Sequence, residues 1–267
     1  MRMSRWLWLS LIVAVSTPAL AFDQRYTDWT ALLRTNVVEV EHGDASRVDY
    51  AAIKHQVGQL DAIARELSGV TAQQYAGWTQ ARREAFLINA YNAFTVKLIV
   101  DHYPGIGSIK DIGGLFTSPW KIDFFSLLGH QTHLNAIEAR LRKPGNFDDP
   151  RIHFAINCAS IGCPMLRSEA YTAEKLDTQL DDQTRRFLSD HSRNRYAGGR
   201  LEVSKIFDWY AADFSHGWHG ITSVKQFFAA HAADLTADAA GQTRIRAQKV
   251  SINYLDYDWH LNGSTTP

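Results

Sequence analysis

The chain has 267 residues, with 28 basic and 28 acidic side chains and no formal net charge. This balance excludes the strongly basic surface that nucleic-acid binding needs, and no charge block marks an interaction tail. Eight tryptophans and an apolar fraction of 45% are typical of a globular protein with a large core.

The first residues have the pattern of a secretory signal peptide. A start with two arginines precedes the apolar run 6–15, and Ala-Leu-Ala at 19–21 is a small-residue cleavage site. The run is shorter than the roughly 20 residues that cross a bilayer. We therefore expect cleavage after 1–21, no membrane span afterwards, and a location in the periplasm or outside the cell. An uncleaved membrane anchor is the alternative.

Apolar side chains recur at helical spacing along much of the remaining chain. Capping signatures begin at Thr71, Asn135 and Ser223, and Pro104 with Gly105 ends the longest helical stretch. In chain order, the expected helical segments are 22–42, 50–67, 71–102, 135–142, 168–189, 207–214 and 223–231.

Strands are expected to be fewer and shorter. Gly129 and His130 separate two halves of a hairpin, Gly198 and Gly199 connect two further strands, and 249–257 alternates as a closing strand. The glycine-rich segment 105–120 is expected to be a loop over the core, and 151–157 has an ambiguous period.

These patterns predict a helix-rich α+β fold with a small, mostly antiparallel sheet. Without the signal peptide, 26 basic and 28 acidic side chains remain, which is a formal charge of −2. The remaining 246 residues fit one large domain. We expect this domain to cover 22–262, followed by a disordered C-terminal tail at 263–267.

Two motifs carry a resemblance to a known family. They read FLINAYNAF at 86–94 and DPRIHFAINCASIGCPMLR at 149–167. Their joint occurrence over about 75–190 resembles the DUF547 family, which is named for its lack of a known function. The resemblance implies membership but no reaction.

This chain departs from the pattern that the resemblance implies. Relatives have a His where this chain has Ala139, and often a second Pro where it has Met165. Some relatives have Ser at the position of Cys163 but keep the residues that match Cys158 and His153. The resemblance therefore favours Cys158 for chemistry. If the missing His is catalytic in relatives, this chain lacks part of the apparatus.

Cys158 is the candidate nucleophile, because a thiolate activated by a nearby imidazole attacks acyl carbons. His153 is its candidate base, although both helix and strand spacing place the two side chains on different faces. They can meet if the chain bends near Asn157. The alternatives are a Cys158–Cys163 disulfide, which an oxidising compartment favours, a reversible dithiol, and a core role for His153.

Asn89 and Asn92 lie one helical turn apart in a segment rich in apolar residues, so their buried amides need specific partners. Either they tie the helix to a loop backbone, or they form the polar wall of a binding pocket. Tyr91 lies between them and is a further binding candidate, although it faces another side of the helix.

Arg151 and Arg167 flank the cysteine motif and are candidates for binding an anionic substrate group or for lowering a thiol pKa. Salt bridges to nearby acidic residues explain them equally well. His130 and His133 have a spacing that could ligate a metal, but no third ligand is near them in the sequence. We therefore expect no metal and no cofactor.

The sequence as a whole favours an exported envelope protein with thiol-dependent hydrolase or acyltransferase chemistry. The chemical logic is that of cysteine hydrolases, which makes a papain-like or transglutaminase-like fold one option. The alternative is a non-catalytic ligand-binding or partner-binding domain with a structural disulfide. In both cases the expected partner is a small-molecule or peptide-like envelope substrate, and the oligomeric state stays open.

Overall fold

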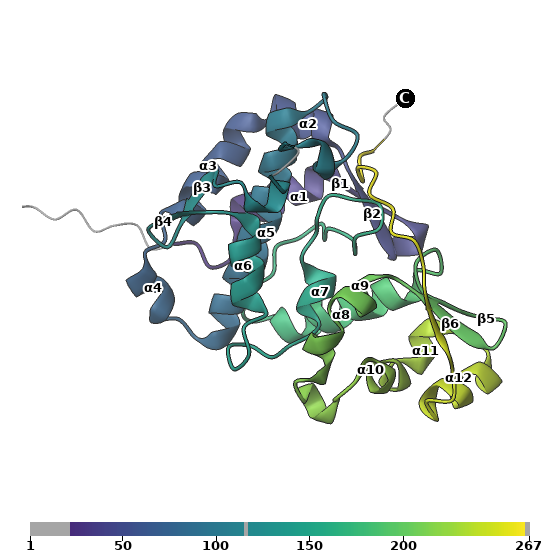
Figure 1. The fold of residues 1–267 in the computed structure, drawn as a ribbon. Coiled ribbons are helices and arrows are strands. Elements are labelled where there is room, and N and C mark those ends of the chain that lie inside the picture. The colour runs from purple at the N-terminus through teal and green to yellow at the C-terminus, as the bar shows by residue number, and fades with distance from the viewer. Residues whose placement is uncertain (1–21, 115–116, 265–267) are drawn as a thin grey trace, which may run out of the picture.

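The computed structural model describes residues 22–114 and 117–264. Helices make up most of these residues, and the strands form small, mostly antiparallel sheets (Figure 1). The predicted helix-rich α+β fold is therefore confirmed. The expected signal peptide, 1–21, lies outside the described residues.

The α-helices differ widely in length, and the longest is α5. Their bounds are α1 (Thr27–Asn36), α2 (Tyr50–His55), α3 (Val57–Ser68), α4 (Ala72–Ala76), α5 (Gln80–His102), α6 (Leu134–Leu141), α7 (Ile152–Ala155), α8 (Leu176–Ser189), α9 (Ile206–Trp209), α10 (Val224–Ala230), α11 (Ala232–Leu235) and α12 (Ala239–Arg246).

The strands pair mostly with neighbours in the sequence. Their bounds are β1 (Val37–Val40), β2 (Ala45–Val48), β3 (Phe125–Leu127), β4 (His130–Thr132), β5 (Arg195–Ala197), β6 (Arg200–Val203) and β7 (Ile252–Tyr254). The pairs β1–β2, β3–β4 and β5–β6 are antiparallel hairpins, and β7 joins β6 in parallel.

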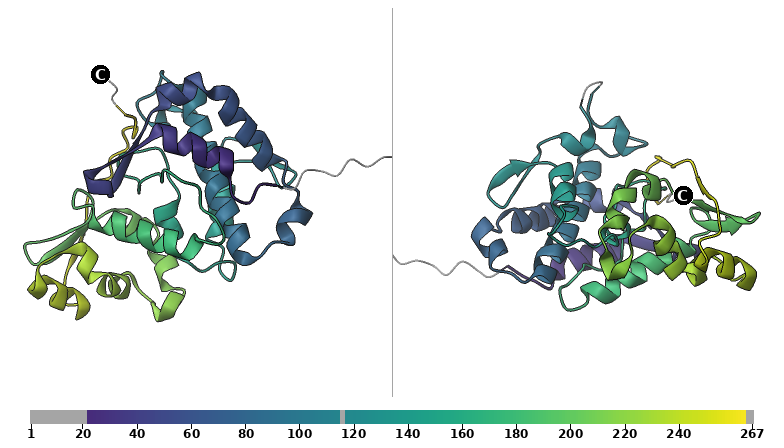
Figure 2. Two further views of the ribbon diagram at one scale, coloured as in Figure 1. Left: turned by 180° about the vertical axis from the view of Figure 1, so that it is seen from behind. Right: turned by 60° about the horizontal axis from the view of Figure 1, so that its bottom comes forward.

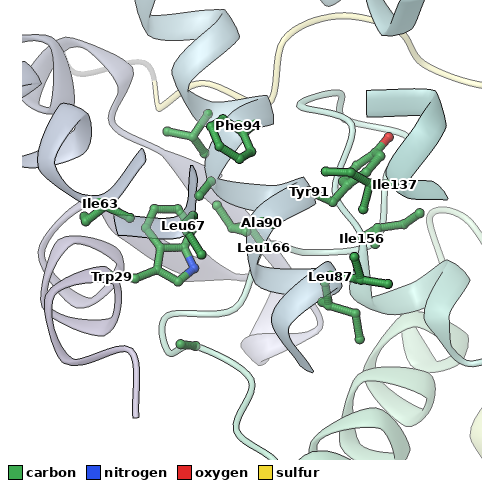
Figure 3. Packing of buried hydrophobic residues seen from close by; sticks show 14 of the residues in the cluster. Trp29, Ile63, Leu67, Leu87, Ala90, Tyr91, Phe94, Ile137, Ile156 and Leu166 are labelled. Carbon is green, nitrogen blue, oxygen red and sulfur yellow. The ribbon is translucent and has the colours of Figure 1, made fainter. Parts of the chain in front are cut away.

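Helix α5 runs through the middle of the first half of the molecule. Thr79 caps its start by accepting the amide hydrogen of Arg82. It is buried on almost every side, because side chains pack against it from several elements. Figure 3 shows Trp29 and Leu67 on one side of α5 and Tyr91 with Ile137 on the other.

The buried side chains form two hydrophobic clusters. The first gathers around α5, and the second lies among α8 to α12 and the sheet β5–β6–β7. The short helix α7 contributes side chains to both clusters. Phe154 belongs to the second cluster, and Ile152 and Ala155 belong to the first. The elements around the first cluster form the first part of the molecule, and those around the second cluster form the second part. The two parts lie next to each other in all views (Figures 1 and 2).

The C-terminal segment returns from the second part to the first, as the yellow chain in Figure 1 shows. The backbone amide of Asn262 donates to the carbonyl of Ala159, and that of Leu261 donates to Gly107. Gly263 and Ser264, which we expected in the tail, pair with Val48. The backbone of the described chain therefore keeps pairing with the first part through 264.

The segments 22–42 and 168–189 are two examples of predicted helices that are shorter than expected. Residues 22–42 form a helix only to Asn36, because the β-branched segment Val37–Val40 pairs with β2 instead. Residues 168–175 stay outside α8, because Thr30 and Asn89 accept the backbone hydrogens of Ala170 and Tyr171. In both places, tertiary hydrogen bonds override a helical pattern.

Local signals elsewhere identify the elements correctly. The capping box at Thr71 is present, Ser223 caps α10, and both glycine-containing hairpins form. The start of α6 differs by two residues, since the side chain of His133, and not that of Asn135, accepts the backbone hydrogen of Ala136.

Because Phe154 is fully buried in the second cluster, we expect Phe154→Ala to lower the free energy of unfolding by about 3–5 kcal/mol. Urea unfolding followed by circular dichroism measures this loss. Val38→Ala is the control, because Val38 is 53% exposed and its truncation should change stability by less than about 0.5 kcal/mol. Equal losses in the two variants would contradict the prediction.

Candidate functional site

A cavity of about 670 Å³ lies beside α6, α7 and the C-terminal segment. Its wall includes side chains from α5, from the turn Pro119–Lys121, from α9 and from the cysteine motif. The cavity thus collects residues from both parts of the molecule and from positions as far apart as Tyr91 and Trp259. This convergence makes it the candidate site.

Aromatic side chains form much of the wall. They are Tyr91, Trp120, Trp209, Tyr210, Tyr257 and Trp259. Several contact one another, with ring centroids 4.5 Å apart for Tyr257 and Trp259 and 5.7 Å apart for Trp120 and Trp259. Trp209 is 44% exposed and packs against Tyr257, so it offers an indole face near solvent.

A polar cluster lies beside these rings, and its members Glu138, Arg142 and His153 also line the cavity. The Nε2 atom of His153 hydrogen-bonds the Oδ2 atom of Asp213 at 2.7 Å, and Nε of Arg142 donates to the same oxygen at 2.5 Å. Arg142 also contacts Glu138 at 3.4 Å and lies over the ring of Tyr210, 4.6 Å from its centroid. Because the Asp213 carboxylate only accepts, Nε2 of His153 carries the hydrogen and Nδ1 remains the ring's acceptor.

Burial and hydrogen bonding act in opposite directions in this cluster. Burial alone would raise the pKa of Asp213, but the hydrogen bonds from His153 and Arg142 outweigh it and hold that pKa at about 2. For His153 burial dominates, and it lowers the pKa below 6.5 despite the opposing effect of Asp213. The resulting state is a neutral imidazole held against an ionised carboxylate.

The two cysteines are joined by a disulfide, with Cα atoms 6.1 Å apart. Both line the cavity. The phenol oxygen of Tyr257 lies 3.2 Å from each sulfur, and Ser160 lies 3.3 Å from the Cys158 sulfur. Of the alternatives that the sequence leaves open, the structure therefore has the disulfide.

His153 and Cys158 line the same cavity, as the thiol hypothesis requires. The chain bends after Asn157 and Ala159 adopts a positive φ of 61°, so the turn that we expected there exists. Among the described residues, however, the side chains that hydrogen-bond the Cys158 sulfur are Ser160 and Tyr257. The imidazole is engaged by Asp213 instead.

Asn89 and Asn92 lie outside the cavity wall and act on backbone. Asn89 donates to the carbonyl of Tyr171 and accepts its amide hydrogen, at 2.7 and 3.0 Å. Asn92 does the same for the carbonyl of Ala155 and the amide of Asn157, at 2.9 and 2.8 Å. The geometry supports the alternative that these amides tie α5 to neighbouring loops.

Arg151 and Arg167 also make structural contacts. Arg151 is 4% exposed and pairs with Asp149, Asp177 and Asp181. Its guanidinium also lies over the ring of Trp218. Arg151 therefore has the structural role that the salt-bridge alternative predicts. Its side chain does not line the cavity beside the disulfide.

Arg167 pairs with Glu169 and Asp182 at 3.2 and 2.7 Å. Neighbouring Tyr171 is fully buried, and burial raises its pKa. Both arginines thus fix the course of the chain around the cysteine motif and leave the cavity to other residues. Of the binding candidates on α5 and beside the motif, Tyr91 is the one on the cavity wall.

Several residues of the site have no motif to identify them. Asp213 and Tyr210 stand about 60 residues after His153, while Tyr257 and Trp259 belong to the C-terminal segment. Glu138, the last residue of the capping signature that begins at Asn135, lines the cavity and contacts Arg142. The one available signal is the clustering of Trp and Tyr at 209–210 and 257–259.

Residues 75–188 match the family model described as "Protein of unknown function, DUF547". The predicted resemblance is confirmed, and this region of the chain carries the family's pattern. The match includes α5, α6, α7 and the disulfide, whereas Asp213 and the C-terminal aromatic side chains lie beyond it. Comparison with curated proteins and with solved structures found no match.

Within 22–114 and 117–264, no helix has the length and apolar character needed to cross a membrane. The same residues contain no group of three or more His, Cys, Asp or Glu side chains placed to hold a metal ion. His133, a candidate ligand by spacing, caps α6.

The buried imidazole should make stability depend on pH. Because the pKa of His153 is lower in the folded state, the unfolded state takes up a proton first as the pH falls below 6.5. The free energy of unfolding should therefore decrease between pH 7.5 and 5.5, and decrease less in His153→Asn. Asp213 does not affect this comparison. Its contribution to the free energy of unfolding is fully present above pH 3.8 and is lost only as the pH falls toward 2. Urea titrations at both pH values test this, and equal decreases would contradict it.

We expect Cys158→Ala and Cys163→Ala to destabilise the protein equally, by about 2 kcal/mol, because each opens the same short loop. Urea unfolding without reductant measures the loss. The double variant is the matched control and should lose no more than either single variant. Thiol titration of the denatured, non-reduced protein should find no free thiol; two thiols, with stability unchanged in Cys158→Ala, would contradict a structural bridge.

Proposed function

We propose that this chain is an exported envelope protein that binds a small organic molecule in the aromatic cavity. The observation that carries the proposal is the cavity itself. Its volume of about 670 Å³ lies within the range of small-molecule sites. Its wall combines apolar rings with a few converging polar groups, as such sites do.

The state of the cysteines supports the same proposal. A disulfide persists in oxidising compartments, which agrees with the signal-peptide pattern of the sequence. With its sulfur bonded to Cys163, Cys158 has no thiolate to offer and instead forms part of the wall. The periplasm or the cell exterior is therefore the proposed location.

A thiol-dependent enzyme is the second candidate, and one observation favours it. The Cys158 sulfur shares the cavity with an imidazole that an aspartate orients. Nucleophile, base and orienting carboxylate are the components of such sites. This candidate needs a reduced disulfide, and it is separated from the first by the thiol titration described above.

Filling the cavity should abolish binding. Ala139 is an exposed residue of α6 that lines the cavity, so Ala139→Trp can place an indole there without burying a new side chain in the core. We expect the neutral apolar dye N-phenyl-1-naphthylamine to fluoresce when bound to the wild type, and the variant to weaken its binding at least about tenfold. A fluorescence titration measures both affinities.

Ala239→Trp is the matched control, because Ala239 is an exposed helical residue of α12 that does not line the cavity. This variant should bind the dye like the wild type. No dye binding by the wild type, or equal binding by the Ala139→Trp variant, would contradict the proposed cavity function.

A further inference from the structure

The ionised groups of the cluster Asp213, Arg142 and Glu138 do not balance, and two of them, Arg142 and Glu138, line the cavity. Asp213 is ionised, since its pKa is about 2, and Arg142 is charged, since its carboxylate neighbours raise its pKa against the effect of burial. The Glu138 carboxylate adds a second negative charge. Two carboxylates against one guanidinium leave one net negative charge.

The other titratable side chains of the wall are neutral. His133 accepts the backbone hydrogen of Ala136 through Nδ1, which requires an unprotonated nitrogen there. Burial keeps His153 neutral and raises the pKa values of Tyr91, Tyr210 and Tyr257. The other side chains of the wall therefore do not cancel the negative charge of this cluster.

Glu138 is the carboxylate available to a ligand. Arg142 is committed to Asp213, at 2.5 Å and 3.4 Å, and meets Glu138 only at 3.4 Å. The Glu138 side chain is only 12% exposed, so its charge is poorly solvated. A poorly solvated carboxylate gains most from a cation placed beside it.

The aromatic wall also favours a positively charged ligand. The faces of Trp and Tyr rings carry negative electrostatic potential and attract ammonium groups within about 6 Å. The ring of Trp259 already binds an ammonium group in this way. The ammonium of Lys110, which does not line the cavity, lies 3.8 Å from its ring centroid. Among the described lining residues, Arg142 is the Arg or Lys side chain that an anion could meet, and it is paired with Asp213 and covered by Tyr210.

We propose that the ligand is a small organic cation, an ammonium group on a short apolar body, seated between Glu138 and the rings of Trp209, Tyr210 and Tyr257. This inference rests on the proposed binding function and gives it a ligand class. Alkyl groups on the nitrogen would contact the rings, and the positive charge would compensate Glu138. Anions are the ligand class that the charge disfavours.

Displacement of N-phenyl-1-naphthylamine from the full mature protein tests the charge preference. Choline is compared with 3,3-dimethyl-1-butanol, which has the same shape but a tert-butyl group in place of trimethylammonium. We expect choline to displace the dye at a concentration about tenfold lower, since a desolvated cation–π contact is worth that factor or more. Equal displacement by the two probes would overturn the cation assignment.

The charge of Glu138 is tested by Glu138→Gln, which keeps the side-chain shape. In this variant the preference for choline over 3,3-dimethyl-1-butanol should fall by about tenfold. Asp208→Asn is the matched control, because this substitution also removes one negative charge. Asp208 is exposed, precedes Trp209 and does not line the cavity. An unchanged preference in the Glu138→Gln variant, or an equal loss in the control, would overturn the assignment of Glu138.

The outcomes separate the two proposals. If the dye binds and Ala139→Trp blocks it, but choline has no advantage, the binding function stands and the ligand class fails. If the dye does not bind, the binding function fails. Sedimentation with phosphatidylcholine vesicles distinguishes a free cation from a lipid headgroup. The proposal expects the protein to stay in solution, and vesicle binding without displacement by choline would overturn it.

Discussion

The side chain of Asn157 fixes the bend on which the disulfide and the cavity depend. Its amide nitrogen donates to the carbonyl of Pro164, and its oxygen accepts the amide hydrogen of Ala159. One side chain thus holds both ends of the loop that carries Cys158 and Cys163. Asn92 binds the backbone of Asn157 in turn, so the bend is anchored to α5. Each of these bonds is buried, where losing a partner leaves an unsatisfied polar group.

Gly162, in the same loop, has no space for a side chain. A Cβ atom at this position would lie 2.9 Å from the ring of Tyr257 and 3.0 Å from the carbonyl oxygen of Asp258. Without a side chain, the loop approaches the C-terminal segment closely, and its backbone amides at 161 and 162 donate to His260 and Asp258. This contact places Tyr257 against the two sulfurs and closes one side of the cavity.

Sequence patterns predicted what is decided locally and little beyond it. Capping boxes and glycine turns act within a few residues, so Thr71, Ser223 and the hairpins were identified correctly. The site combines His153 with Asp213 and Cys158 with Tyr257, which are 60 and 99 residues apart. Spacing carries no information on such pairs. For the same reason the buried amides at 89 and 92 could be recognised as needing partners, while the partners themselves could not be predicted.

Position 139 connects the family resemblance with the cavity. The resemblance implies a His there, and in this chain the position is an exposed residue on the cavity wall next to Glu138. An imidazole at 139 would add a proton-transfer group to the cavity and occupy part of its volume. Ala139 removes that group and leaves space bounded by rings and one poorly solvated carboxylate. With the sulfurs joined and His153 engaged by Asp213, what this cavity offers a ligand is shape and charge, which supports binding over proton transfer.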